Sequence, residues 1–153
     1  MDLNVVCLTW NLCGADAFTS QTECSELLST EALSDADVLA VGLQELSIWE
    51  WWNLSSESWE AVICRQVKCV APRLVYLTLP WSRRPHMATN QLLVFVNRSL
   101  LVEISSVETQ LLRSNLLGCL GNKGSVVVRV ALRHCGVLLL ATCHFAAFDY
   151  KWR

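Results

Sequence analysis

The sequence predicts a mixed α/β fold whose sheets are largely buried. Apolar runs of strand length outnumber the segments with helical spacing, and the helical segments interrupt the series of strands. The length of 153 residues fits one domain, which we place over residues 1–153. Hydrophobic residues make up 53% of the chain, against ~45–50% in an ordinary soluble domain. We therefore expect some apolar surface without cover.

The first half of the chain is expected to hold three strands and two helices. Apolar and β-branched runs closed by polar residues, Gly or Pro predict the strands. Apolar residues at helical spacing behind Ser, Thr or Gln predict the helices, and Ser55, Ser56 and Ser58 are N-cap candidates for the second. The expected order is strand Asn4 to Trp10, helix Thr19 to Leu33, strand Val38 to Leu43, a helix running to Val67 whose periodic face is Trp59, Val62, Ile63 and Gln66, and strand Arg73 to Leu79.

The second half is expected to be almost entirely strands. Trp81 to Asn90 is polar and predicts a loop. Two apolar runs on either side of Asn97-Arg98-Ser99 predict a hairpin, and two longer ones predict another hairpin at the end. The expected strands are Gln91 to Val96, Leu100 to Thr109, Ser125 to Leu132 and Val137 to Cys143.

Charge and apolar length limit the classes of partner. The formal charge of −2 does not favour nucleic acid, which basic domains bind. The most apolar stretch, Gly136 to Cys143, is far shorter than the ~20 residues of a membrane-spanning helix. The amino terminus shows no secretory pattern, so we expect a cytoplasmic protein whose eight cysteines are reduced and mostly buried.

Four polar positions lie at the ends of apolar strands, where a scaffold presents functional side chains to a common crevice. They are Asn11, Gln44-Glu45, Asn122-Lys123 and His144. Each also has a structural explanation: Asn11 as a turn residue, Glu45 as a solvated strand end, Lys123 as a turn charge and His144 as a structural histidine. An acid directly after a buried strand is, however, often a metal ligand.

The turn Gly121-Asn122-Lys123-Gly124 is the most specific pattern in the chain. Glycine allows close approach of the backbone, and lysine adds a mobile positive charge. By itself the turn is compatible with a phosphate-binding loop or with an ordinary hairpin turn.

Four segments in order resemble the inositol polyphosphate 5-phosphatases of the endonuclease/exonuclease/phosphatase superfamily. That family carries Thr-Trp-Asn-x-x-Gly, Gly-Leu-Gln-Glu, Gly-Asn-Lys-Gly and Ser-His-Leu-x-x-Gly. The matching segments here are Thr9 to Gly14, Gly42 to Glu45, Gly121 to Gly124 and Cys143 to Ala147. The resemblance runs from Val5 to about Ala147.

The resemblance implies a four-layer fold in which a two-sheet β-sandwich is flanked by helices, here incomplete. It also implies Mg²⁺-dependent hydrolysis of the 5-phosphate of an inositol phosphate or phosphoinositide headgroup. It implies Glu45 and Asn11 as metal ligands, His144 as the catalytic residue that stabilises the transition state, and Asn122 and Lys123 as supports for substrate phosphates or for the loop. Contact with a membrane would be peripheral, and the Trp-rich stretch Ile48 to Trp59 is a candidate for it, although core packing also explains its rings.

The chain also departs from the family pattern. Cys13 stands where the family usually has a second Asn, and Phe148 where it usually has Gly. The family's water-activating Gly-Asp-Leu-Asn-Tyr segment, its Trp-Cys-Asp-Arg segment and its final Asp-His pair have no counterpart up to Arg153. We therefore expect an incomplete sandwich, corresponding to the N-terminal half of the catalytic domain, that is inactive or unstable alone.

Two other functions remain open. The first is a nuclease or other phosphodiesterase of the same superfamily, which the charge and the Gly-Asn-Lys-Gly turn disfavour. The second is a non-catalytic remnant that serves as an interaction module.

Overall fold

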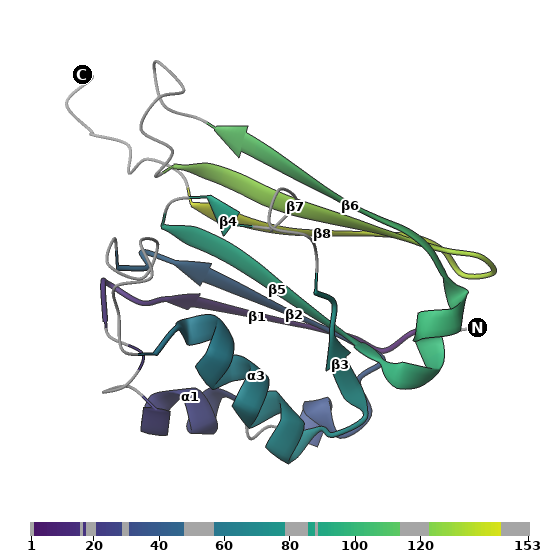
Figure 1. Ribbon diagram of the computed structural model, residues 1–153, viewed down its shortest axis with the longest axis horizontal. Coiled ribbons are helices and arrows are strands. Elements are labelled where there is room, and N and C mark those ends of the chain that lie inside the picture. The colour runs from purple at the N-terminus through teal and green to yellow at the C-terminus, as the bar shows by residue number, and fades with distance from the viewer. Residues whose placement is uncertain are drawn as a thin grey trace, which may run out of the picture.

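Two stacked sheets and a layer of helices make up the chain, in the computed structural model shown in Figure 1. The structure describes residues 2–15, 17, 21–28, 31–47, 57–78, 86–87, 89–113 and 123–144. The helices cover one face of the first sheet, and the second sheet covers the other face (Figure 1). This is the α/β sandwich flanked by helices that the sequence and its resemblance imply.

The first sheet has the order β1-β2-β5-β3, with β4 also paired to β5. Strands β1 and β2 are parallel, and the other pairs are antiparallel. Because β1 and β2 run the same way, their carboxyl ends meet at one edge of the sheet. The strands are β1 Val5–Asn11, β2 Val38–Gln44, β3 Leu74–Tyr76, β4 His86–Met87 and β5 Asn90–Asn97.

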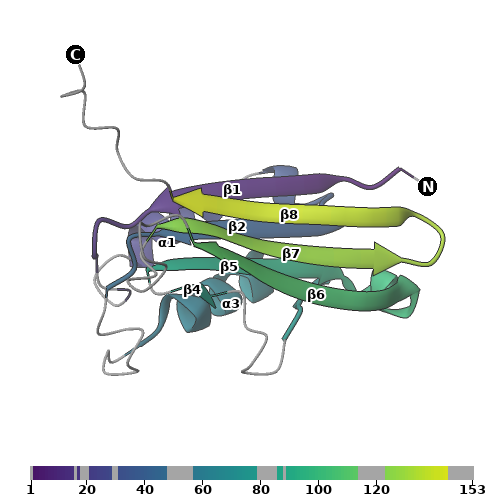
Figure 2. The same ribbon diagram turned by 90° about the horizontal axis from the view of Figure 1, so that it is seen from above.

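The second sheet is an antiparallel meander with β7 in the centre. Its strands are β6 Ile104–Arg113, β7 Gly124–Leu132 and β8 Gly136–His144. The predicted terminal hairpin is confirmed, and β6 extends it. Figure 2 shows β1 and β8 along the same side of the sandwich, each as the last strand of its sheet.

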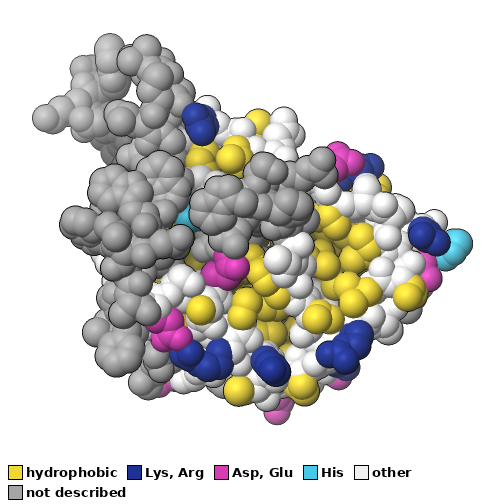
Figure 3. Space-filling model, viewed as in Figure 1, with side chains coloured by type: hydrophobic (Ala, Val, Ile, Leu, Met, Phe, Trp, Pro, Cys, Tyr) yellow, Lys and Arg dark blue, Asp and Glu magenta, His cyan; other side chains and the backbone are white. Residues whose placement is uncertain are grey.

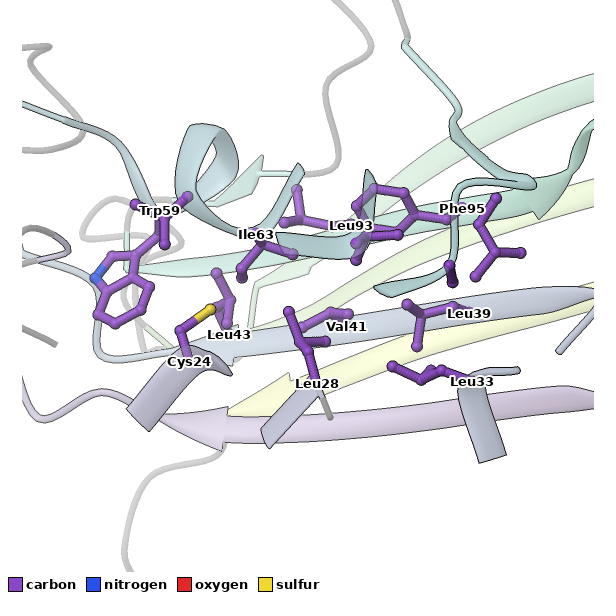
Figure 4. Packing of buried hydrophobic residues seen from close by; sticks show 14 of the residues in the cluster. Cys24, Leu28, Leu33, Leu39, Val41, Leu43, Trp59, Ile63, Leu93 and Phe95 are labelled. Atoms are coloured by element: carbon purple, nitrogen blue, oxygen red, sulfur yellow. The ribbon is translucent and has the colours of Figure 1, made fainter. Parts of the chain in front are cut away.

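Alternation along the buried strands builds two cores, because successive side chains point to opposite faces of a sheet. On β2, Leu39, Val41 and Leu43 face the helices, whereas Val38 and Ala40 face the second sheet. Figure 4 shows the first of these cores, where β2 and β5 side chains meet those of α1 (Gln21–Leu28) and α3 (Trp59–Val70).

Helix α3 begins as its sequence predicts. The Ser58 side chain accepts a hydrogen bond from the Ala61 backbone at 3.2 Å, which caps the first turn. Trp59 is fully buried, packs edge-on against Trp10 and donates from Nε1 to the Ala15 carbonyl at 3.1 Å. The buried face also includes Val67 in place of the expected Gln66, which is half-buried. Of the Trp-rich stretch, residues 48–56 lie outside the described residues.

The predicted hairpin between Gln91 to Val96 and Leu100 to Thr109 is wrong. Asn97 caps a 3-10 helix, Arg98–Glu103 (η3), by accepting from the Ser99 backbone at 3.2 Å. The chain thereby leaves the first sheet and enters the second, so β5 and β6 lie in different sheets. The apolar run Leu100 to Val102 reflects the burial of Leu100 under the turn rather than a strand.

Other boundaries differ modestly from those expected. The helix expected over Thr19 to Leu33 consists of α1 and a separate 3-10 turn, Glu31–Leu33 (η1). Strand β3 is shorter than Arg73 to Leu79, since only three residues pair with β5. The segment expected as a polar loop contains β4, and its last residue begins β5.

The cysteines of the described segments are reduced, but most of them are not buried as expected. No disulfide joins cysteines of the described part, where Cys24 is buried and Cys7, Cys13, Cys69 and Cys143 are exposed. Burial raises the pKa of the Cys24 thiol to about 11. Cys64, half-buried on α3, has its pKa raised to about 11, mainly by burial and further by the Glu60 charge.

Apolar surface without cover is present, as the composition predicts. Val102, Val137 and Leu139 are 72%, 53% and 69% exposed. Figure 3 shows hydrophobic side chains gathered in a broad area on one face, with charged side chains around it. No helix of the described segments is long and apolar enough to cross a membrane.

Candidate active site

The ends of β1 and β2 bring two of the predicted site residues to one edge of the first sheet. Asn11 pairs with Gln44 in the parallel register, and Glu45 follows directly. Two further hydrogen bonds tie the chains together beyond the strands: Leu12 N–H to the Gln44 carbonyl and Gly14 N–H to the Glu45 carbonyl, both at 2.8 Å. The position of the Glu45 backbone is therefore fixed by the segment after β1.

Backbone strain is concentrated at this edge. Glu45 has φ 55° and Cys13 has φ 50°, and among the described residues these are the two non-glycine positions with positive φ. Left-handed backbone costs a side-chain-bearing residue on the order of 1–3 kcal/mol, and such positions cluster at functional sites. The carboxylate of Glu45 is thus presented by a conformation that the surrounding hydrogen bonds have to hold.

Three predicted site residues, Glu45, Lys123 and His144, meet in space. Nε2 of His144 lies 3.2 Å from Oε1 of Glu45 and 2.6 Å from Nζ of Lys123. The His144 side chain is 14% exposed, whereas that of Glu45 is 39% exposed. The carboxylate is therefore open to solvent and ligands, while the imidazole is held inside the wall of the site.

Strand pairing explains why Lys123 reaches His144. Gly124 pairs with His144 at the start of β7, so Lys123 stands at the adjoining end of β8. Gly124 has φ 144°, and a Cβ there would lie 2.0 Å from the Leu112 carbonyl oxygen. The second glycine of the Gly-Asn-Lys-Gly turn is thus required by sheet packing.

The other two predicted site residues, Asn11 and Asn122, make no described contact with Glu45, Lys123 or His144. Oδ1 of Asn11 accepts from the Cys13 backbone at 3.0 Å, which closes a tight turn after β1. The Cys13 thiol also donates to this oxygen, with Sγ 3.6 Å away, so a cation bound at Asn11 would replace this weaker thiol contact. Asn122 lies outside the described residues.

A polar network beneath the site was not predicted from sequence. Nε2 of Gln44 donates to Oγ1 of Thr142 at 2.7 Å and lies 3.0 Å from Oγ1 of Thr9. Gln44 and Thr142 are buried and Thr9 is exposed, and together the three side chains join β1, β2 and β8, and therefore both sheets. Gly42 permits this approach, because a Cβ there would lie 2.5 Å from Oγ1 of Thr142. The one sign of this network in the sequence is that a glutamine, Gln44, ends an otherwise apolar strand.

Asn90 at the start of β5 is a second polar residue that sequence reasoning missed. It is fully buried, and neither its Nδ2 nor its Oδ1 has a hydrogen-bond partner within the described part of the chain. It lies near the site in the sheet, since Leu43 pairs with its neighbour Gln91. Leaving a buried polar group unpaired costs ~1–3 kcal/mol.

The donor set fits a hard cation that keeps most of its waters. Glu45 offers a solvent-accessible carboxylate, and Asn11 offers an amide oxygen on the neighbouring strand end. The described residues contain no group of three or more His, Cys, Asp or Glu that could enclose a metal. One or two oxygen ligands on the protein suit Mg²⁺.

A cavity of about 520 Å³ opens beside this network. Strands β1 and β8, which supply part of its wall, lie along one side of the sandwich in Figure 2. Its walls come from β1, β2, β5 and β8 and include Thr9, Gly42 and Thr142. Most of the lining is apolar, so the cavity is a gap at the side of the sandwich next to the polar site.

The fold resembles that of a solved phosphatase domain. The inositol polyphosphate 5-phosphatase domain of SPsynaptojanin, solved with inositol (1,4)-bisphosphate and a calcium ion, superposes with a TM-score of 0.71 at 24% sequence identity. The match covers 97% of this chain and 41% of that chain. The chain thus spans about two fifths of the length of the protein that it matches.

The sequence itself matches a family profile over most of its length. Residues 8–153 match endonuclease/exonuclease/phosphatase family 2. That range includes every residue of the candidate site, from Asn11 to His144. The chain belongs to endonuclease/exonuclease/phosphatase family 2.

Proposed function

We propose that this chain provides part of the active site of an inositol polyphosphate 5-phosphatase. The proposed reaction is Mg²⁺-dependent hydrolysis of the 5-phosphate of an inositol phosphate or of a phosphoinositide headgroup. The observation that carries the proposal is the convergence of Glu45, Lys123 and His144 at one sheet edge, with Nε2 of His144 within 3.2 Å of both partners. A carboxylate can bind the metal ion, and an ammonium and an imidazole can bind the oxygens of a phosphate ester that the metal holds.

Each side chain of the site would have a separate role in the proposed reaction. Bound Mg²⁺ would neutralise phosphoryl charge and orient the leaving group, with Glu45 and Asn11 as its protein ligands. His144, held in the wall of the site, would donate a hydrogen bond to a phosphoryl oxygen as negative charge develops there. Lys123, and Asn122 beside it in sequence, would support the other phosphates of the ring.

The neighbouring structure supports the choice of substrate. The ligand of the SPsynaptojanin domain, inositol (1,4)-bisphosphate, has no phosphate at position 5, as the product of 5-phosphate removal would. That domain also holds a divalent cation, calcium, which supports a cation requirement here. Headgroup recognition would take place in the cytoplasm, with peripheral contact to a membrane when the substrate is a lipid.

The proposed activity depends on residues beyond those present here. The chain covers 41% of the SPsynaptojanin chain, and the resemblance assigns water activation to a segment that has no counterpart up to Arg153. We therefore propose that residues 1–153 form the N-terminal part of the catalytic domain and do not turn over substrate alone.

The test is phosphate release by the longest natural polypeptide that contains these residues. Inositol (1,4,5)-trisphosphate, a 5-phosphorylated lipid in vesicles and abasic duplex DNA would be assayed in parallel with Mg²⁺. We expect phosphate from the inositol substrates and no DNA cleavage, and both Glu45→Gln and His144→Ala should lower the rate by about 10² or more. DNA cleavage without phosphate release would instead identify a nuclease.

A further inference from the structure

The second sheet ends one strand short of the first on the side where β1 and β8 lie. Strand β8 lies over β2, because the Thr142 side chain bonds Gln44 and a Cβ added at Gly42 would lie 2.5 Å from Oγ1 of Thr142. Strand β1 lies beyond β2 as the last strand of the first sheet. Figure 2 shows β1 outside β8 along most of this side. No described strand of the second sheet therefore covers the inner face of β1.

The exposure of the β1 side chains agrees with this missing cover. Alternation along the strand directs Cys7 and Thr9 towards the second sheet, and both are exposed. Leu8 and Trp10, on the opposite face, are half-buried against the helices. Cys7 and Thr9 form one wall of the cavity of about 520 Å³, and β8 from Leu139 to Cys143 forms another. The cavity is thus a groove along the free edge of β8, with the width of one strand.

The two sides of the sandwich differ in how their edge strands are protected against further pairing. On the side away from the groove, β3 and β4 are three and two residues long. Strand β6 carries Glu108 and Arg113, and its register shifts between Ile104 and Ser106. Short strands, charges and bulges all hinder the addition of another strand. On the groove side, β1 and β8 are seven and nine residues long, pair in regular register and contain no Asp, Glu, Lys or Arg.

We propose that the free edge of β8 pairs with one extended strand from the part of the catalytic domain that lies outside residues 1–153. This inference rests on the function proposed above, in which these residues form the N-terminal part of that domain. The match that covers 97% of this chain covers 41% of the SPsynaptojanin chain, which supports a further part of the domain as the source of the strand.

The groove defines the chemistry of this strand. Main-chain hydrogen bonds to β8 hold it, as in other cases of strand addition. Its inward side chains fill a mostly apolar groove above Cys7, and its outward side chains lie beside Val137 and Leu139, which are 53% and 69% exposed. The strand is therefore apolar on both faces.

A second copy of the chain fits this edge less well. Antiparallel pairing of β8 with the β8 strand of a copy would relate the two sandwiches by a two-fold axis. The β2 strand of the copy, which lies beneath its own β8, would then need the space that β1 occupies. A single strand has no such conflict, because the groove has the width of one strand.

Amide hydrogen exchange tests the inference in the 153-residue chain and in the longest natural polypeptide that contains it. In an antiparallel edge strand, alternate residues direct their N–H groups away from the neighbouring strand. We expect these outward amides of β8 to exchange about 100-fold more slowly in the longer polypeptide, and those of β6 to exchange equally fast in both. Equal rates for β8 in the two proteins, or protection of β6 instead of β8, would overturn the inference.

Cys7 and Cys69 provide matched substitutions, because both thiols are exposed. Cys7→Trp fills the groove, whereas Cys69→Trp adds the same side chain on α3. In the 153-residue chain both variants should unfold like the wild type. In the longer polypeptide Cys7→Trp should return the outward β8 amides to fast exchange, and Cys69→Trp should not. Protection of β8 that survives Cys7→Trp would show that no strand lies in the groove.

Two further readings separate the inference from its alternatives. If protection of β8 in the 153-residue chain rises over an about hundredfold increase in protein concentration, the occupant is a second copy and the inference is wrong. Phosphate release by the longer polypeptide without protection of β8 would overturn the inference and leave the proposed function standing. Protection of β8 without phosphate release would support the inference and contradict the proposed function.

Discussion

Gln44 and Thr142 join the two sheets directly beneath the candidate site, through a hydrogen bond of 2.7 Å between Nε2 and Oγ1. Both residues are buried, at 7% and 5% exposure. The bond fixes the end of β2, which presents Glu45, against β8, which presents His144. The relative position of the carboxylate and the imidazole therefore depends on a contact that neither of them makes.

Thr142→Val should destabilise the chain by about 1–3 kcal/mol, because it keeps the shape of the side chain and leaves a buried amide donor short of its acceptor. Thr109→Val is the matched control, since Oγ1 of Thr109 is buried without a hydrogen-bond partner in the described part of the chain. Urea unfolding measures both. Equal midpoints for the two variants would show that the bond contributes nothing to stability.

Gly124→Ala should disrupt the pairing of β6 with β7, since its Cβ would meet the Leu112 carbonyl oxygen at 2.0 Å. Gly136→Ala is the control, because Gly136 also has positive φ, at 88°, yet has no atom within 4 Å of the added Cβ. Strain alone should cost Gly136→Ala ~1–2 kcal/mol, and Gly124→Ala should lose several times more. Thermal unfolding followed by circular dichroism compares them, and similar losses would contradict the assigned role of Gly124.

Cys13→Asn should stabilise the chain by roughly 0.5–1 kcal/mol. Cys13 has φ 50°, and asparagine tolerates left-handed backbone better than other side-chain-bearing residues. This preference gives a physical reason why the family usually has asparagine at the matching position. Cys13→Gly should also relieve the strain, whereas Cys13→Ala should not. A melting temperature that rises equally for all three variants would assign the effect to loss of the thiol instead.

The stability of the chain should fall in alkaline solution partly because of Cys24. Its raised pKa of about 11 keeps the folded thiol protonated where the unfolded thiol, with a pKa near 9.0, has ionised. The contribution is therefore complete below about pH 9 and is lost as pH rises towards 11. Cys24→Ala removes it, so the free-energy cost of this substitution should shrink by about 2 kcal/mol between about pH 7.5 and about pH 10.5. A cost that stays constant with pH, measured by urea unfolding, would contradict the shift.

Periodicity predicts those elements whose burial is decided locally. Strand β2 carries no polar side chain before Gln44 because both of its faces are covered. Helix α3 begins at Trp59 because the preceding Ser58 caps its first turn. Local burial also explains why a strand was wrongly predicted to begin at Leu100. A buried leucine under a 3-10 turn has the same local pattern as a strand residue, and only the path of the chain between two sheets distinguishes them.

The candidate site was accessible from sequence because strand ends can be located and Glu45 and His144 stand at them. The network of Gln44 with Thr9 and Thr142 was not, since its members are 35 and 98 positions apart and depend on how the sheets stack. The contact of Lys123 with His144 likewise follows from the register of β7 with β8, which no local pattern specifies.

The most direct test of the account is whether the carboxylate of Glu45 binds a divalent cation. Mn²⁺ binding to the 153-residue chain can be followed by electron paramagnetic resonance for the wild type, Glu45→Gln and Glu31→Gln, which alters an exposed acid of the η1 turn. We expect Glu45→Gln to weaken Mn²⁺ binding on the order of tenfold or more, while Glu31→Gln binds like the wild type. Equal affinity for all three proteins would contradict it.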